Sequence, residues 1–272
     1  LACNFDPAAT NDDGSCDFCS CATEGMVYMD YTMSVEEYAV DIIPGMTTYR
    51  FYMNMTNEDD FLSSIYGNEE APLSLSTTTG FYNSQFGATT AGGVNPAFLA
   101  FFPDLAADSW VTIGIDSQPE GSESAISTVE STDQPWVGAF AAASAIDGQD
   151  ILIDDQTGGA WYVLNGTPNG LPDPINNRVL FMQLSTAGVV SGTLNTQVFG
   201  NGDGSDDIRG VFSFSGTGVY SPESASSSNA CGCMDPEAIN FDPEADYDDE
   251  SCIDVIEGCL DEVACNYDAL AN

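Results

Sequence analysis

The chain has 272 residues, of which 43% are hydrophobic, enough for one β domain of about 200 residues plus small segments at its ends. It carries 43 acidic residues against three arginines, with no lysine and no histidine, so its formal net charge is -40. This field repels nucleic-acid phosphates, which are bound through Lys and Arg, and it equally repels anionic lipid headgroups. The charge therefore predicts no nucleic-acid partner. No apolar run approaches about 18 residues, so membrane insertion is not predicted either.

The first segment, residues 1–21, is acidic and rich in cysteine. Two carboxylates about 4 Å apart repel by about 4 kcal/mol at an effective dielectric near 20, so carboxylates without basic partners favour bound divalent cations. Calcium takes about six to eight oxygen ligands. Turns at Pro7 and Gly14 would bring such ligands together in this segment. The predicted calcium ligands are Asn4, Asp6, Asp12 and Asp13. The alternative is that Asn and Asp only form turns through side-chain to backbone hydrogen bonds.

The nine cysteines are confined to the two ends, and residues 22–230 contain none. Cys-rich segments flanking a Cys-free domain indicate disulfides and an oxidising, extracellular compartment. Zinc is the alternative, because Cys19 and Cys21, and Cys231 and Cys233, are close pairs. It is disfavoured because no histidine is present and these cysteines are not separated by the usual two residues. A Cys21–Cys231 bond that ties the two ends of the central domain together is a further hypothesis.

Residues 22–230 are predicted to form an all-β sandwich, a jelly roll or a related fold, because short apolar stretches alternate with Gly, Pro, Asn and Asp clusters. The candidate strands are 26–32, 36–43, 48–55, 73–79, 109–115, 150–153, 160–164, 178–185, 192–199 and 209–215. Alternation of apolar and polar residues in 49–55 predicts one buried face. The stretches 160–164 and 178–182 are apolar on both faces and are predicted to be nearly fully buried. Residues 95–102 are predicted as one helical turn or a buried loop.

The three tryptophans are candidates for a sugar-stacking platform. Trp110 and Trp161 lie in predicted strands, where packing in the core is the expected role. Trp136 follows Gln-Pro in a predicted loop, where an exposed contact and core packing are both open.

Several loop signals carry alternative interpretations. Residues 201–207, Asn-Gly-Asp-Gly-Ser-Asp-Asp, resemble a calcium loop in composition but lack the terminal Glu of an EF-hand, so a hairpin turn is predicted. Sequons begin at Asn54 and Asn165, which are therefore candidate N-glycosylation sites. Ser and Thr clusters at 74–79, 122–132 and 221–228 are predicted as linkers, with O-linked glycans as the alternative.

The pattern of the first segment returns at the other end of the chain. Residues 2–16 read ACNFDPAATNDDGSC and residues 238–252 read AINFDPEADYDDESC. This second copy occupies 231–257, and a third begins in 258–272. The predicted calcium ligands of the second and third copies are Asn240, Asp242, Asp248, Asp249, Asn266 and Asp268. A Cys233–Cys252 disulfide would close a loop of about 20 residues and stabilise this coreless segment by roughly 3 kcal/mol.

The first copy lacks the N-terminal part of the motif, and the third copy lacks the C-terminal part. One hypothesis is that the chain is one unit of a longer array, cut within a motif. The alternative is that proteolysis, or the extent of the segment in view, sets these two ends.

The copies resemble the extracellular repeat GCTDxxAxNYDPxAxxDDGSC of secreted surface proteins from marine bacteria, especially Bacteroidota, and more distantly thrombospondin type 3 repeats. This resemblance implies acidic loops that bind calcium between disulfides, in a secreted or cell-surface protein. Ile239 replaces a cysteine of the motif, Glu250 a glycine and Ala269 a proline, which puts individual bridges and loops in doubt. The central stretches TYRFY, DSWVTIG and GAWYVLNG are similar to sandwich domains that accompany this repeat.

The sequence argues against an enzyme. Without His or Lys, the Ser-His-Asp, Cys-His and Schiff-base routes are closed, and no pair of carboxylates is singled out for glycoside hydrolysis. The expected function is a structural protomer of an extracellular, calcium-stabilised filament or cell-surface assembly, joined end to end to copies of itself or to adjacent repeat units. The alternative is a carbohydrate-binding adhesin module on a calcium-stiffened stalk, with glycans as partners.

Overall fold

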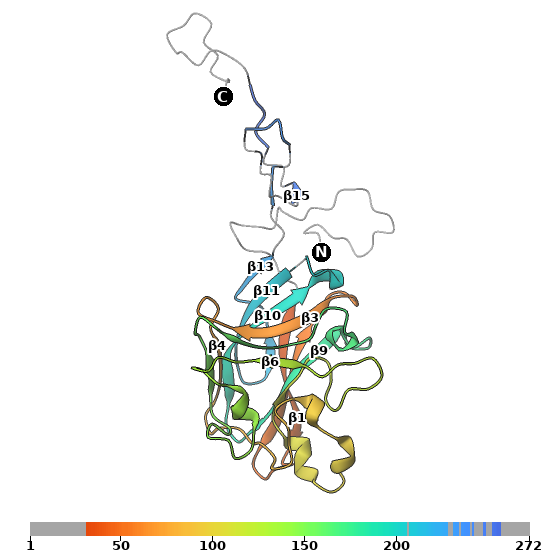
Figure 1. Ribbon diagram of the computed structural model, residues 1–272, viewed down its shortest axis with the longest axis vertical. Coiled ribbons are helices and arrows are strands. Elements are labelled where there is room, and N and C mark those ends of the chain that lie inside the picture. Colours follow the sequence, from red (N-terminus) through yellow and green to blue (C-terminus); the bar gives the residue numbers. More distant parts are fainter. Residues whose placement is uncertain are drawn as a thin grey trace, which may run out of the picture. The chain divides into compact units, whose positions relative to one another are not determined.

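The computed structural model describes residues 31–205, 207–227, 231–233, 235–239, 241, 247–248 and 252–256. The chain divides into two compact units: one is Met29–Ser226, and the other comprises Leu1–Tyr28 and Ser227–Asn272. The described residues of the first unit form two antiparallel β-sheets with short 3-10 helices between the strands (Figure 1). The prediction of an all-β sandwich is therefore confirmed.

The first sheet has five strands in the order β12-β1-β2-β9-β5, all antiparallel. They are β1 Thr32–Val40, β2 Thr47–Asn54, β5 Trp110–Val111, β9 Arg178–Thr186 and β12 Gly218–Tyr220. β2 has the predicted alternation, because Phe51 and Met53 are completely buried whereas Arg50 and Tyr52 are only half-buried. Since side chains alternate along a strand, Arg50 and Tyr52 lie on the outward face of the sheet.

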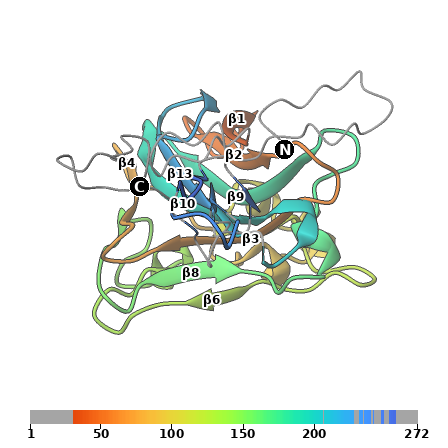
Figure 2. The ribbon, with the colours of Figure 1, turned by 90° about the horizontal axis from the view of Figure 1, so that it is seen from above.

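The second sheet has the order β13-β11-β10-β3-β8-β6, and β4 pairs with both β10 and β7. Its strands are β3 Phe61–Gly67, β4 Leu73–Thr77, β6 Ser127–Val129, β7 Ile151–Ile153, β8 Gly159–Tyr162, β10 Val190–Phe199, β11 Asp207–Ser215 and β13 Ser224–Ser227. The 3-10 helices are η1 Ala91–Gly93, η2 Pro96–Phe98, η3 Pro103–Ala107, η4 Val137–Phe140, η5 Pro168–Gly170 and η6 Gly200–Gly202. Figure 2 shows β3, β8 and β6 in one layer and β1, β2 and β9 in the other. In the described part of the chain, no helix is long and apolar enough to cross a membrane.

Large apolar side chains fill the space between the sheets. The ring of Phe51 lies 6.0 Å from that of Phe181 and 5.4 Å from that of Phe214, measured between centroids. Trp161 of β8 donates its indole N–H to the carbonyl of Phe181 in β9 at 3.1 Å, which links the two sheets. β9 is buried at every position except Arg178, as predicted from its apolar residues on both faces. Each such side chain contributes about 1.5–3 kcal/mol on burial, so this core is the main source of stability.

The strand predictions were wrong at several places. β1 is one continuous strand where two strands, ending at 32 and starting at 36, were predicted. β3 and β12 lie where no strand was predicted. The predicted linkers 74–79, 122–132 and 221–228 include residues of β4, β6 and β13. β6 and β13 lie at sheet edges, where backbone pairing needs no apolar side chains.

The predicted hairpin at residues 201–207 is confirmed. β10 and β11 pair in antiparallel register from Phe199 and Asp207 onward, and η6 begins the connection. Asn201 has φ +49°, a left-handed conformation that Asn tolerates better than most residues.

In the described part of the sandwich, more carboxylates accept hydrogen bonds from backbone N–H groups than form ion pairs. The described residues contain three ion pairs, one for each arginine, at Asp116, Glu36 and Asp207. Elsewhere, carboxylates cap loops: Glu130 accepts hydrogen bonds from two successive N–H groups at 2.9 and 2.8 Å, and Asp173 from two others at 2.9 and 3.0 Å. Such bonds stabilise a charged oxygen without a basic side chain.

Asp108 and Asp60 are the two of these caps that have no exposed surface. The two carboxylate oxygens of Asp108 accept hydrogen bonds from the N–H groups of Ser84 and Ala88 at 2.8 and 2.9 Å. Gly87 lies against this carboxylate so closely that a side chain at position 87 would collide with it. Burial raises the pKa of Asp108 to about 7, although the backbone N–H groups of Ala88, Ser84 and Ser109 favour the charged form.

This raised pKa predicts that stability falls as the pH rises. The contribution of neutral Asp108 is fully present below about pH 4, the usual range for Asp, and is lost as the pH rises through about 7. We expect the free energy of unfolding of the wild type to fall relative to that of Asp108→Asn by at most about 4 kcal/mol over this window. Chemical denaturation of both proteins at several pH values measures the difference. A difference that is constant with pH, or that grows in favour of the wild type, contradicts the assignment.

Candidate functional site

The predicted calcium ligands lie almost entirely outside the described residues. This holds for Asn4, Asp6, Asp12, Asp13, Asn240, Asp242, Asp249, Asn266 and Asp268. Only the backbone of Asp248 is described, in β15 (Tyr247–Asp248), which pairs in parallel with β14 (Cys231–Gly232). Among the residues that are described, no group of three or more His, Cys, Asp or Glu side chains could hold a metal ion. Calcium at the ends of the chain therefore stays a prediction.

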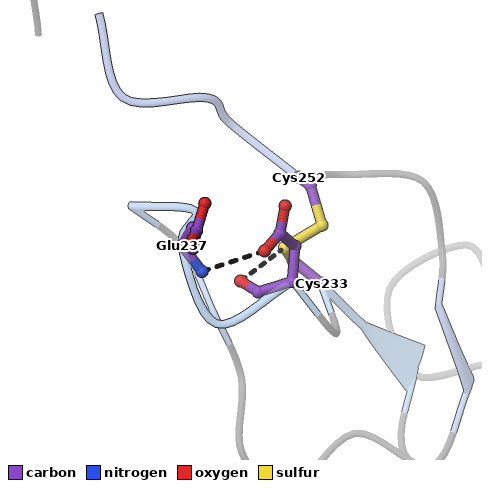
Figure 3. The surroundings of a disulfide bond; sticks show 4 residues. Cys233, Glu237 and Cys252 are labelled. Atoms are coloured by element: carbon purple, nitrogen blue, oxygen red, sulfur yellow. Dashed lines mark hydrogen bonds between the residues drawn. A yellow bond between two sulfur atoms is a disulfide. The ribbon is translucent and has the colours of Figure 1, made fainter. Parts of the chain in front are cut away.

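The structure contains a disulfide between Cys233 and Cys252, the pair predicted from the sequence (Figure 3). The Cα atoms are 4.8 Å apart and the sequence separation is 19. A turn follows Cys233, in which the Asp235 carboxylate accepts a hydrogen bond from the Glu237 N–H at 2.9 Å. The Ile239 N–H donates to the Ile253 carbonyl at 3.0 Å, so the bridge and a backbone bond hold the same two stretches together. The predicted Cys21–Cys231 bond falls outside the described side chains.

All three tryptophans are buried, which contradicts a sugar-stacking platform made of them. Trp110 and Trp161 are 2% and 1% exposed, in agreement with the predicted core role. Trp136, for which an exposed contact was open, is also 2% exposed. Its ring packs 5.4 Å from that of Trp161, and its indole N–H donates to the Val129 carbonyl at 2.9 Å. A loop tryptophan thus closes the end of the core beside β6 and β8.

The two predicted glycosylation sites differ in accessibility. The side chain of Asn54 is half-buried in β2, and its amide nitrogen donates to Thr32 and Ser34 at 3.0 and 2.7 Å. Asn165 is exposed in a turn after β8, where its amide donates to the Gly202 carbonyl at 2.9 Å. Attachment of a sugar at Asn54 would disturb strand contacts, whereas attachment at Asn165 would not.

A cleft of about 620 Å³ opens on the outward face of the first sheet, within the size range of small-ligand sites. We call this feature the cleft. β2 contributes Arg50 and Tyr52, and β9 contributes Arg178 and Leu180. Two connecting segments contribute the rest of its lining: Gly114, Ile115, Asp116, Ser117, Gln118, Glu120 and Glu123 from one, and Pro168, Asn169, Leu171, Pro172, Asp173, Pro174 and Asn176 from the other.

Two of the three arginines in the chain lie in the cleft, and both are held in place. The Arg50 guanidinium lies 3.7 Å from the Tyr38 ring centroid and pairs with Asp116 at 3.2 Å. The Arg178 guanidinium lies 3.8 Å from the Tyr52 ring centroid and pairs with Glu36 at 2.7 Å.

The two connecting segments of the cleft are fixed against each other by Asn169. Its buried amide donates to the carbonyls of Ile113 and Ser124 at 2.8 and 3.2 Å and accepts from the Ser124 N–H at 3.2 Å. Gly114 has φ +74°, and a side chain there would collide with the Asn169 carbonyl. Three prolines restrict the second segment further. The cleft is therefore formed before any ligand arrives.

A second surface feature is an exposed group of apolar side chains, Phe86, Phe98, Leu99, Phe101 and Phe102, which we call the aromatic patch. Phe86, Phe98 and Phe101 are 55%, 50% and 76% exposed, and Phe102 is half-buried. The Phe102 ring centroid lies 4.1 Å from that of Phe86 and 6.4 Å from that of Phe98. In Figure 1 the η2 and η3 region, in yellow, lies at the end of the sandwich away from β11 and β13. Of the two interpretations of residues 95–102, the helical turn is confirmed by η2 and the buried loop is wrong.

Sequence reasoning missed the cleft. Its arginines stand about 130 residues apart in the chain and meet only through the pairing of β2 with β9. The scarcity of arginine is visible in the sequence, but it does not show that Arg50 and Arg178 line one cleft.

Comparison with known proteins gives no relative. No family model, no curated protein and no solved structure matches the chain.

The Cys233–Cys252 bridge predicts a local effect of reduction. Loss of a bridge that closes a loop of this length costs about 3 kcal/mol, and residues 22–230 contain no cysteine. We expect a reductant to increase amide hydrogen exchange in residues 231–256 by at least about tenfold while β9 and β10 keep their protection. Cys233→Ala with Cys252→Ala should reproduce this result without reductant. Unchanged exchange near the bridge, or equal loss of protection in β9, contradicts the expectation.

Proposed function

We propose that this chain is a non-catalytic structural protomer of an extracellular assembly, in which calcium and disulfides stabilise the acidic ends and copies of the chain contact one another. The observation that supports this proposal best is the aromatic patch. Exposed apolar patches on soluble proteins mark interaction surfaces, and the partner here is a second copy of the chain.

Charge is the reason for choosing a second copy. Two chains that each carry a net charge of -40 repel each other, so they approach most easily where carboxylates are absent. No charged residue occurs from Ala71 to Pro103, a range that contains the whole patch. Its backbone is ordered by hydrogen bonds, including those from Phe101 and Phe102 to the Phe98 carbonyl at 2.9 and 2.8 Å. An ordered apolar surface loses little entropy when a partner binds.

The extracellular location is supported by cysteine usage. The Cys233–Cys252 bridge needs an oxidising compartment, and it lies in a segment too small to have a core of its own. The absence of His and Lys from the sequence supports a role without catalysis. The motif copies at both ends support joining of units in series, with calcium in the acidic loops.

Sedimentation of the full chain in calcium-containing buffer tests the proposal. We expect concentration-dependent self-association, weakened about tenfold or more in Phe98→Ser with Phe101→Ser, because two apolar anchors are lost. Leu164→Ser with Val219→Ser is the matched control, since those side chains are 74% and 70% exposed outside the patch. A calcium chelator should weaken association further. A wild type that stays monomeric with and without calcium overturns the proposal. Equal effects of both double variants would show that the aromatic patch is not the contact surface between copies.

The cleft favours a second candidate function, that of a carbohydrate-binding module. It is preformed, polar, and lies on the sandwich itself. Both functions are compatible in one chain, because the cleft and the aromatic patch share no residue.

A further inference from the structure

The cleft lining restricts the charge of its ligand. Its two arginines face four carboxylates: Asp116, Glu120, Glu123 and Asp173. Arg50 is already paired with Asp116 and also donates to Gln183 at 2.9 Å, with 13% of its side chain exposed. An anionic ligand would therefore meet neutralised arginines, surplus carboxylates and the field of a chain with net charge -40.

A cation fits the cleft no better. Arg50 and Arg178 both line the cleft, with their guanidinium groups over the rings of Tyr38 and Tyr52, and would repel a second positive charge. No group of carboxylates in the described residues is close enough to hold a metal ion. The ligand that suits mixed donors and acceptors is uncharged and rich in hydroxyl groups, because each hydroxyl both donates and accepts.

We propose that the cleft binds a short neutral oligosaccharide. Glu120 and Gln118 are the side chains to hold its hydroxyls, because both line the cleft, both are exposed, and neither side chain has a hydrogen-bond partner among the described residues. Arg178 supplies further donors, since its ion pair with Glu36 uses one terminal nitrogen. Leu171, Pro168 and Pro174 of the second segment are exposed and offer apolar surface to the C–H faces of the sugar rings.

The rigid construction of the cleft supports this assignment. Hydroxyl groups exchange hydrogen bonds with water for bonds with protein, so net affinity depends on polar groups that are already in position. Asn169 joins the two segments, and the Tyr52 ring orients Arg178. The inference rests on the second candidate function and adds its site, its contact residues and the charge class of its ligand.

Calorimetric titration of the full chain tests the inference with cellotetraose, mannotetraose and xylotetraose, and with a tetragalacturonate and a chitosan tetramer as charged counterparts. We expect binding of at least one neutral tetramer and of neither charged one. The affinity should not change between about 0.05 M and about 0.5 M NaCl, because no charge is neutralised. Glu120→Gln and Gln118→Ala should each weaken binding about tenfold.

The matched controls are Glu69→Gln and Gln149→Ala, which change exposed residues outside the cleft lining and should leave affinity unchanged. Thermal unfolding of each variant shows that the fold is kept. If a neutral tetramer binds but the cleft variants bind it as well as the controls do, the cleft is the wrong site and the carbohydrate-binding function stands. If only a charged tetramer binds, the ligand class is wrong. If none binds, the inference and the second candidate function both fall.

Discussion

Scarcity of positive charge governs how this chain places its carboxylates. With 43 acidic and three basic residues, the chain cannot balance its carboxylates by ion pairs. The sandwich places its carboxylates at the surface or against backbone N–H groups, and its interior is made of Phe, Trp, Met and aliphatic side chains. Asp60 and Asp108 are the extreme cases, since both are buried completely, and Asp108 is held by the backbone of the loop that it organises.

The same constraint explains the distribution of surface features. Each arginine lies by an aromatic ring and a carboxylate, and two of the three share one cleft. The stretch from Ala71 to Pro103 is free of charge, and part of it forms the aromatic patch. A chain that repels its own copies over most of its surface thus has, among its described residues, an exposed apolar area that suits the assembly we propose and a polar cleft that suits the neutral ligand we propose.

Sequence patterns predicted the class of fold and much of its core. The alternation in 49–55 and the apolar stretch at 178–182 each report burial within a single strand, and both predictions are confirmed. β3 was not predicted because Ser63 and Ser64 interrupt its apolar pattern. Both serines are buried, and Ser64 donates a hydrogen bond to Gln197. The role of Trp136 was left open because its burial depends on contacts with β6 and β8 and not on its neighbours in the sequence. The cleft could not be foreseen, since pairing of β2 with β9 decides which distant residues meet.

Repulsion among carboxylates opposes the fold, and apolar packing and backbone hydrogen bonds stabilise it. The dependence of the Tm on salt measures the balance between these effects. Raising NaCl from about 0.02 M to about 0.5 M shortens the screening length from about 20 Å to about 4 Å. We expect the Tm of the sandwich to rise over this range, and KCl to have the same effect. A Tm that falls with salt would mean that attractive ion pairs dominate, and net repulsion among the carboxylates would then be wrong.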